Sequence, residues 1–228
     1  MGMLSNGERI AVKYLLSTTQ CHEKQFKNEV DNLMKVRHKN VVQFRGYCYE
    51  TSLKCMKYNG VNIFAEKSPE RLLCFEYMAN GSLDNYISEE LCGLAWHQRY
   101  KIIKGICCGL YYLHDECQIN SFVIHLDLKP ENILLDDNMV PKIADFGLAK
   151  LFDDNKTHTC ATSRVGSMGY MAPEYIFEGI ISPMADIYSL GVIIVQMITG
   201  RKLGPSGTEA FCSDFVGPVR NFMSDIKI

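Results

Sequence analysis

A run of polar residues near the middle of the chain constrains its fold and chemistry more than any other feature. It reads His125-Leu126-Asp127-Leu128-Lys129-Pro130-Glu131-Asn132, and Asp145-Phe146-Gly147 begins thirteen residues after Asn132. Short β-branched runs at residues 122–124, 133–135 and 142–144 flank both polar stretches, which predicts short strands joined by charged loops. Such an arrangement can bring several polar side chains to one place.

Four side chains of this block supply what phosphoryl transfer requires. That reaction needs cations that neutralise phosphate charge, a group that takes the proton of the attacking hydroxyl, and a lysine beside the transferred group. We predict that Asp127 takes the proton and that Lys129 stabilises the γ-phosphoryl. Asn132 and Asp145 are predicted to hold Mg²⁺, a hard cation that prefers oxygen ligands. A single aspartate would be read as part of an ordinary Asx-turn, but the ordered set favours chemistry.

The block resembles the catalytic loop and the Asp-Phe-Gly loop of eukaryotic protein kinases. Ala11-Val12-Lys13 is similar to that family's third-strand motif, which implies that Lys13 contacts the phosphates of ATP and that Glu29 on the next helix is its ion-pair partner. Residues 73–78 look like the segment that joins the two kinase lobes, where backbone groups near Glu76 and Met78 would bind adenine. The resemblance therefore implies ATP and Mg²⁺ as cofactors.

Further motifs resemble Ser/Thr kinases of the plant receptor-like type. Lys129 is typical of Ser/Thr kinases, whereas tyrosine kinases usually carry Ala-Arg in this loop. Segments at residues 80–84, 166–170 and 186–191 look like plant receptor-like kinases. By that resemblance, Asp186 fixes the backbone of the catalytic loop and the Ser167 hydroxyl contacts Asp127 and Lys129. The resemblance to these kinases covers about residues 6–200, and it implies a protein substrate with Ser or Thr hydroxyls.

The expected fold is α+β and bilobal, like that of protein kinases. Residues 1–78 are expected to form an incomplete, β-rich small lobe with the family's third to fifth strands. Helical spacing marks residues 22–37, and residues 50–70 are polar and aperiodic, which predicts an insert or a long loop. Strand patterns occur at residues 7–16, 41–49 and 72–77.

Residues 79–228 are expected to form an incomplete, larger helical lobe that carries the catalytic loop. Apolar residues recur every three or four positions over residues 96–114. Residues 184–199 are apolar nearly all round and are followed by Gly200, which predicts a buried central helix with a glycine cap. Residues 204–228 are rich in turn residues and weakly periodic, and they read as unlike the family.

Two features depart from the kinase pattern. Only twelve residues precede Lys13, and Gly2 and Gly7 among them form no G-x-G-x-x-G, so we expect the glycine-rich loop over the ATP phosphates to be missing and ATP binding to be weak. Leu126 stands where many kinases have an arginine that binds a phosphate on the activation segment. Leucine cannot donate hydrogen bonds, so control by phosphorylation through this position is disfavoured.

Composition excludes several other classes. A net charge of -2 without basic blocks argues against nucleic acid and anionic membrane partners. The ten cysteines contain no C-x-x-C, so they are expected to be reduced thiols in the cytoplasm, and His158 with Cys160 lacks a second ligand pair for zinc. No signal peptide is evident, and the apolar segment 190–198 is about half the length that spans a bilayer. A parent receptor would place the chain on the cytoplasmic face of the plasma membrane.

Two functions remain open at this point. The first is a Ser/Thr protein kinase. The second is a kinase-like binding or scaffold module without turnover, because no residue replaces the glycine-rich loop. An α+β hydrolase is a distant third, since the sequence contains no G-x-S-x-G.

Overall fold

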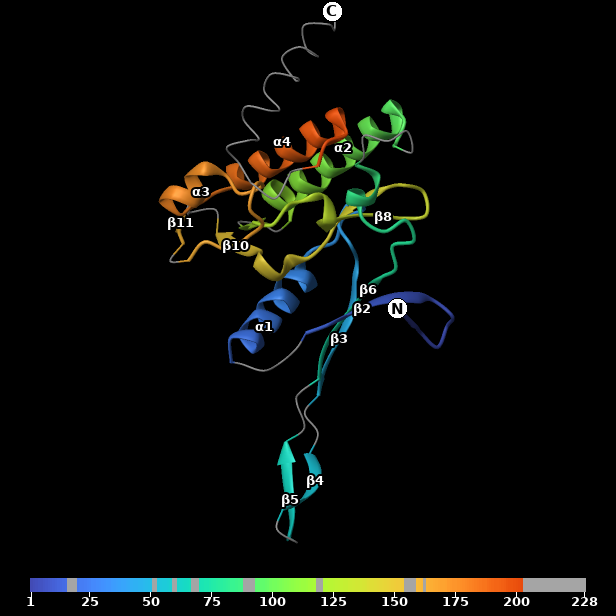
Figure 1. The fold of residues 1–228 in the computed structure, drawn as a ribbon, viewed down its shortest axis with the longest axis vertical. Helices are drawn as coiled ribbons and strands as arrows, with labels where there is room; N and C mark the ends of the chain where they lie inside the picture. The colour runs from blue at the N-terminus through green and yellow to red at the C-terminus, as the bar shows by residue number, and fades with distance from the viewer. Residues whose placement is uncertain are drawn as a thin grey trace, which may run out of the picture.

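The computed structural model describes residues 1–15, 20–50, 53–58, 61–66, 70–87, 93–117, 121–153, 159–161 and 163–202. Within them, a four-stranded antiparallel sheet with one helix adjoins a larger part built around two long helices (Figure 1). The predicted α+β class is confirmed. Residues 204–228, whose sequence reads as unlike the kinase family, lie outside the described residues.

The sheet has the strand order β1-β2-β6-β3, formed by Gly2–Met3, Arg9–Tyr14, Glu70–Glu76 and Phe44–Glu50. Strand β1 was not predicted from the sequence. The β2 and β6 strands pair with Lys13 opposite Leu73. Helix α1 (Gln20–Lys35) packs on β3 through Phe26, whose ring centroid lies 6.0 Å from that of Tyr47 and 5.8 Å from that of Tyr49.

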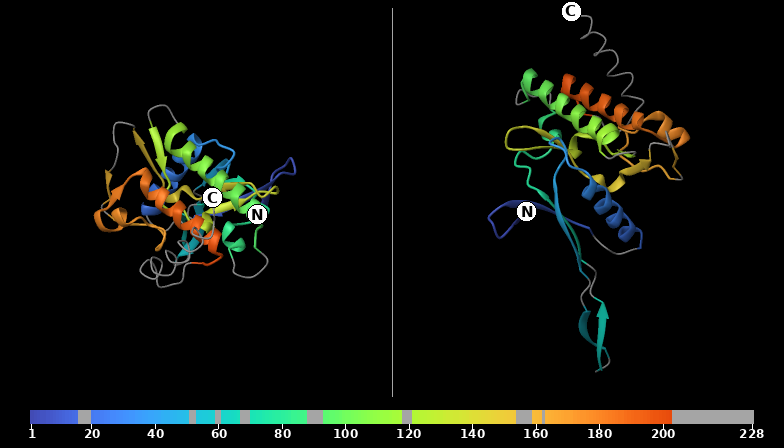
Figure 2. Two further views of the ribbon diagram at one scale, coloured as in Figure 1. Left: turned by 90° about the horizontal axis from the view of Figure 1, so that it is seen from above. Right: turned by 180° about the vertical axis from the view of Figure 1, so that it is seen from behind.

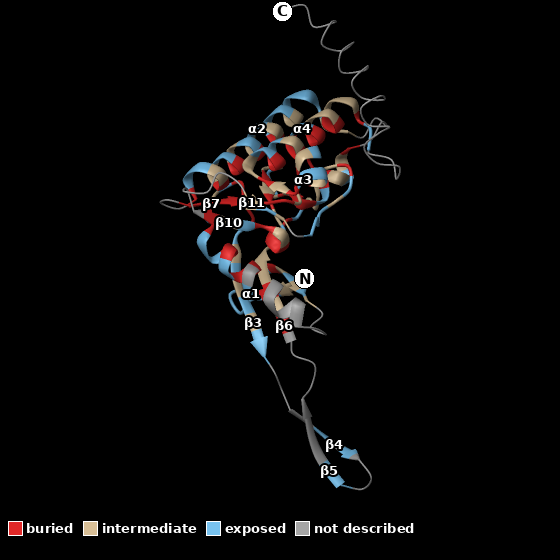
Figure 3. Cartoon of the chain, turned by 90° about the vertical axis from the view of Figure 1, so that its left-hand side faces the viewer, coloured by how far each residue is buried: buried red, intermediate tan, exposed pale blue. Residues whose placement is uncertain are grey.

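The insert between β3 and β6 forms a hairpin rather than the predicted loop. Strands β4 (Leu53–Tyr58) and β5 (Val61–Glu66) pair antiparallel as a separate two-stranded sheet, which extends away from the rest of the molecule (Figures 1 and 3). The sequence carries the signal that the expectation overlooked, because Asn59-Gly60 separates the two strands and this dipeptide favours two-residue hairpin turns.

In the larger part, helices α2 (Trp96–Tyr111) and α4 (Pro183–Thr199) lie side by side (Figure 2). The predicted helices are confirmed, and Gly200 caps α4 with φ 73°. Short elements complete this part: η1 (Leu83–Tyr86), the π-helical turn η2 (Tyr112–Glu116), β7 (Ser121–Ile124), η3 (Pro130–Asn132), β8 (Ile133–Leu135), β9 (Pro141–Ile143), η4 (Phe146–Leu148), β10 (Lys150–Asp153), β11 (Thr159–Cys160), α3 (Pro173–Glu178) and β12 (Ile180–Ile181).

Burial is concentrated where the helices meet the short strands (Figure 3). Helix α2 buries Ile102, Ile106 and Leu110. Trp96 and Tyr100, which the sequence groups with the periodic apolar residues, are more than half exposed. The helical period predicted for residues 96–114 is therefore confirmed, but Trp96 and Tyr100 lie off the buried face.

Two glycines of α2 allow a neighbouring segment to approach the helix closely. A Cβ atom at Gly105 would lie 2.5 Å from Cγ of Pro141, and one at Gly109 would lie 2.7 Å from the carbonyl oxygen of Asn40. That same oxygen accepts a hydrogen bond from the Ile143 amide at 2.9 Å. The Asn40 carbonyl group is therefore packed against Gly109 and is also held by its hydrogen bond from Ile143.

We expect Gly109→Ala to lower the free energy of unfolding by about 1–3 kcal/mol, because the added methyl group overpacks against backbone. Gly191→Ala on α4 is the matched control, since nothing lies within 4 Å of its added Cβ. That change should stabilise the chain by about 0.5–1 kcal/mol through helix propensity alone. Urea unfolding of both variants measures the difference, and equal effects of the two substitutions would contradict the close approach.

Candidate functional site

A cavity of about 240 Å³ lies where the sheet meets the loops after β7 and β9. Five of the eight predicted site residues line it: Lys13, Glu29, Glu76, Asn132 and Asp145. Its remaining lining is mostly apolar: Ala11, Val12, Val42, Phe75, Glu131, Leu134 and Ala144. A mostly apolar cleft with a few convergent charges is typical of a small-molecule site.

Lys13 joins residues from three parts of the chain at one end of this cavity. Its Nζ lies 2.8 Å from Oε1 of Glu29 on α1 and 2.7 Å from Oδ1 of Asp145. Asp145 has a left-handed backbone (φ 67°), and it precedes Phe146, which is fully buried and packs edge-on against the His125 ring at 5.1 Å. A strained residue persists only where its surroundings hold it, and buried Phe146 provides that support.

The three charges perturb one another. Burial would lower the pKa of Lys13, but the Glu29 and Asp145 carboxylates raise it on balance. Burial raises the pKa of Glu29, and the Lys13 ammonium only partly opposes this. For Asp145, burial favours a higher pKa, yet the Lys13 charge and hydrogen bond bring it below its usual value. Two carboxylates therefore share one ammonium, which leaves excess negative charge in the cleft.

Asp127 and Lys129 adjoin the cavity through Asn132. The Asn132 Nδ2 donates to Oδ2 and the backbone oxygen of Asp127, at 3.1 and 2.8 Å. The Lys129 Nζ lies 3.3 Å from Asp127 Oδ2 and donates to Ser167 Oγ at 2.7 Å. Ser167 Oγ donates in turn to Asp127 Oδ1 at 2.8 Å. The predicted contacts of Ser167 with both residues are confirmed.

Asp186 holds the backbone that carries Asp127. Its carboxylate is fully buried and accepts the amides of His125 and Leu126, each at 2.8 Å. The predicted anchoring of the catalytic loop by Asp186 is confirmed. Leu126, which lies between His125 and Asp127, has a backbone φ of 65°. This conformation costs free energy for a bulky side chain.

The oxygen atoms of Asn132 and Asp145 suit a hard divalent cation. Asn132 donates through Nδ2, and its Oδ1 makes no hydrogen bond to another described residue. Asp145 uses Oδ1 for Lys13 and the Gly147 amide, which leaves Oδ2 available. Among the described residues, no group of three or more His, Cys, Asp or Glu side chains could hold a metal. These two oxygens suit a hard divalent cation that takes further ligands from phosphate and water.

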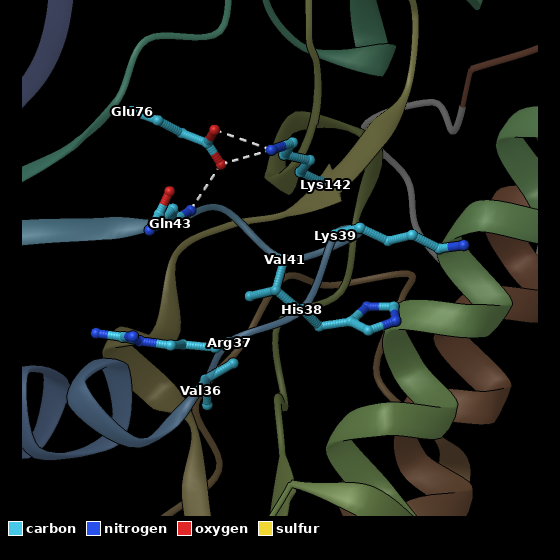
Figure 4. Close-up of a pocket in the computed structure, with 8 residues that line it drawn as sticks. All are labelled: Val36, Arg37, His38, Lys39, Val41, Gln43, Glu76 and Lys142. Atoms are coloured by element: carbon cyan, nitrogen blue, oxygen red, sulfur yellow. Dashed lines mark hydrogen bonds and ion pairs between the residues drawn. The ribbon is translucent and has the colours of Figure 1, made fainter.

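Glu76 is shared by two cavities. It lines a second cavity of about 330 Å³, where its carboxylate binds the Lys142 Nζ at 2.8 and 2.9 Å and accepts the Gln43 amide at 2.7 Å (Figure 4). Met78 is buried and does not line the 240 Å³ cavity.

Leu126 packs in an apolar cluster with Phe152, Met171 and Tyr175. This environment suits an apolar side chain such as leucine. Two threonines of the segment that follows Asp145-Phe146-Gly147, Thr157 and Thr162, lie outside the described residues.

Sequence reasoning missed two interactions that support the site. Lys142 neutralises Glu76 from 66 residues away, and His114 reaches Asp186 across 72 residues. Nothing in the local pattern indicates such pairs. His114 ends the periodic helical stretch at residues 96–114, but its partner could be found only in three dimensions.

Comparisons with known proteins point to one family. The protein kinase domain family matches residues 2–217. Cysteine-rich receptor-like protein kinase 26 of Arabidopsis thaliana is 42% identical over 218 residues, covering 94% of this chain and 30% of that protein. The G-type lectin S-receptor-like serine/threonine-protein kinase RKS1 of the same plant is 40% identical, covering 96% of this chain and 24% of that protein.

The family match corrects one expectation, because it continues past residue 204, into a segment that the sequence reading set apart. Glycines and prolines in that segment interrupt its periodicity and hid the likeness. The chain spans less than a third of the length of these two relatives. Because the match covers nearly the whole sequence, the chain belongs to the protein kinase family, and its fold is that of a protein kinase domain.

Proposed function

We propose that this chain transfers the γ-phosphoryl group of ATP to Ser or Thr hydroxyls of proteins, with Mg²⁺ as the metal. One observation carries the proposal: the Lys13 contacts with Glu29 and Asp145 are formed in the same structure as the Asp127–Lys129–Asn132 cluster. A kinase site needs both the lysine–glutamate pair and the metal-binding aspartate in place.

The residues divide the work by position. Lys13, held by Glu29, binds the α- and β-phosphates, while the backbone of residues 76–78 binds adenine. Asn132 and Asp145 hold Mg²⁺, which neutralises the charge on the phosphates. Asp127 takes the proton of the acceptor hydroxyl, and the existing bond from Ser167 Oγ to its Oδ1 supports access of a hydroxyl to this carboxylate. Lys129 stabilises the charge on the transferred group.

Relatives named as receptor-like kinases support a role in signalling at the cytoplasmic face of a membrane, with a protein as substrate. In the described part of the chain, no helix has both the length and the apolar character needed to cross a bilayer.

Binding of ATP is expected to depend on Mg²⁺ and on Lys13. Lys13→Met should weaken ATP binding by about tenfold or more, a loss of about 1.4 kcal/mol, because it removes the cation that contacts the phosphates. Asp145→Asn should remove most of the dependence on Mg²⁺. Titration calorimetry with and without Mg²⁺ measures both effects, and Asp137→Asn is the control because Asp137 is exposed on the neighbouring loop.

Turnover is then measured as transfer of labelled phosphate from ATP to a Ser- and Thr-containing protein, with identification of the modified residues. Label on Ser or Thr supports the proposal. Binding that depends on Mg²⁺ without any transfer would replace it by the binding-module function, and tight binding without Mg²⁺ would contradict the roles of Asn132 and Asp145.

A further inference from the structure

His114 contacts the buried carboxylate that holds the catalytic loop. Its Nε2 lies 2.9 Å from Oδ2 of Asp186, and the two side chains are 8% and 0% exposed. His114 does not line the nucleotide cavity. Its burial and its partner therefore require an explanation other than ligand binding.

The direction of this hydrogen bond follows from the other partners of Asp186. The backbone amides of His125 and Leu126 donate to it, and an ionised carboxylate can only accept. His114 must therefore carry a proton on Nε2 and donate it to Oδ2. That oxygen already accepts the His125 amide, so His114 fixes the carboxylate from a second direction.

A π-helical turn delivers His114 to this position. Helix α2 widens at Tyr112–Glu116, and such turns are frequent at functional sites. The same turn is held independently on another side, because the Tyr112 hydroxyl accepts the Arg37 amide at 2.9 Å and its ring stacks on His38 at 4.9 Å. Tyr112→Phe therefore removes one hydrogen bond of this turn that does not involve Asp186.

We propose that His114 is a positioning residue for phosphoryl transfer, acting through Asp186. The proposal rests on the proposed kinase function. Asp186 holds the Leu126 amide, Leu126 has the left-handed backbone that precedes Asp127, and a strained residue keeps its conformation only while its surroundings determine it. Loss of the His114 donor leaves Oδ2 of Asp186 held by the His125 amide alone, so the carboxylate is less firmly fixed and the position of Asp127 changes with it.

The test uses the 228-residue chain with His114→Phe, which fills the space without a donor, and His114→Gln, whose amide nitrogen can donate in place of Nε2. For His114→Phe we expect kcat to fall by about tenfold to a hundredfold, the range that misplacement of a reacting group produces. The KM for ATP should stay within about twofold, because Lys13 and the cavity are unchanged. His114→Gln should recover most of kcat.

Hydrogen exchange of the chain without nucleotide gives a second readout that does not depend on activity. The Leu126 amide should exchange faster in His114→Phe than in the natural chain, and His114→Gln should restore its protection. Tyr112→Phe is the matched control: it should speed exchange of the Arg37 amide and leave kcat and the Leu126 amide unchanged.

Thermal unfolding establishes that each variant is folded, and His114→Asn, too short to reach Asp186, takes the place of His114→Phe if the latter does not fold. Unchanged kcat and unchanged Leu126 exchange in the variant without a donor would overturn the role of His114. If the natural chain itself transfers no phosphate, the proposed function fails, and Leu126 exchange alone then decides whether His114 positions the loop.

Discussion

Replacing Asp127 with asparagine is expected to lower kcat for phosphoryl transfer by about 10²–10⁴-fold, the contribution of a well-placed general base. Asparagine keeps the shape of the side chain but cannot take the proton of the acceptor hydroxyl. The negative charge that pairs with Lys129 at 3.3 Å is also lost. Affinity for ATP with Mg²⁺ should change little, because Asp127 does not line the nucleotide cavity.

Initial rates of labelled phosphate transfer at saturating ATP measure this effect, alongside calorimetric titration of ATP. Asp137→Asn is the matched control: it makes the same chemical change on an exposed residue ten positions later, and its rate should equal that of the natural chain. A rate for Asp127→Asn within about threefold of the control would show that another group takes the proton, since such a ratio is far below general-base contributions.

The second large effect is expected in stability. Asp186→Asn should lower the free energy of unfolding by about 2–4 kcal/mol, because an amide group replaces a buried carboxylate oxygen that accepts charge-assisted hydrogen bonds. The three donors from His114, His125 and Leu126 cannot all be satisfied by one remaining carbonyl oxygen. A typical domain has only about 5–15 kcal/mol of stability, so this loss is severe.

Urea unfolding followed by circular dichroism measures the change, and Asp137→Asn should stay within about 0.5 kcal/mol of the natural chain, as is usual for surface substitutions. Phosphate transfer by the folded fraction of Asp186→Asn should also fall, since the amides of the catalytic loop lose their acceptor. Equal urea-unfolding midpoints for Asp186→Asn and Asp137→Asn would contradict the role of Asp186 as the anchor of this loop.

The motif residues could be placed from the sequence because each stands in a short loop of fixed spacing. Asp127, Lys129 and Asn132 fall within six residues, so their proximity is almost dictated by the loop itself. Glu29 and Lys13 needed the family likeness, since a lysine on a strand and a glutamate on a helix have no local reason to meet. Their 2.8 Å contact depends on how α1 packs on the sheet.

Other features depend on tertiary packing and escaped the sequence reading. The buried side of α2 is set by the approach of Asn40 and Pro141 to its glycines, which periodicity alone does not reveal. The ion pair of Glu76 with Lys142 and the bond of His114 to Asp186 join residues far apart in the chain. The β4–β5 hairpin was not predicted because the polar composition of residues 50–70 obscures the turn signal of Asn59-Gly60.

The pairing of Glu50 with Glu70 at the base of that hairpin has a consequence for how this kinase domain tolerates change in length. The sheet continues from β3 to β6 across this pair, so the sheet requires only that the two ends of the insert meet. The entropic cost of closing such a connection grows with the logarithm of its length, by about 0.6 kcal/mol for each doubling. Residues 51–69 are therefore a place where chain can be gained or lost over evolution with little effect on the nucleotide cleft.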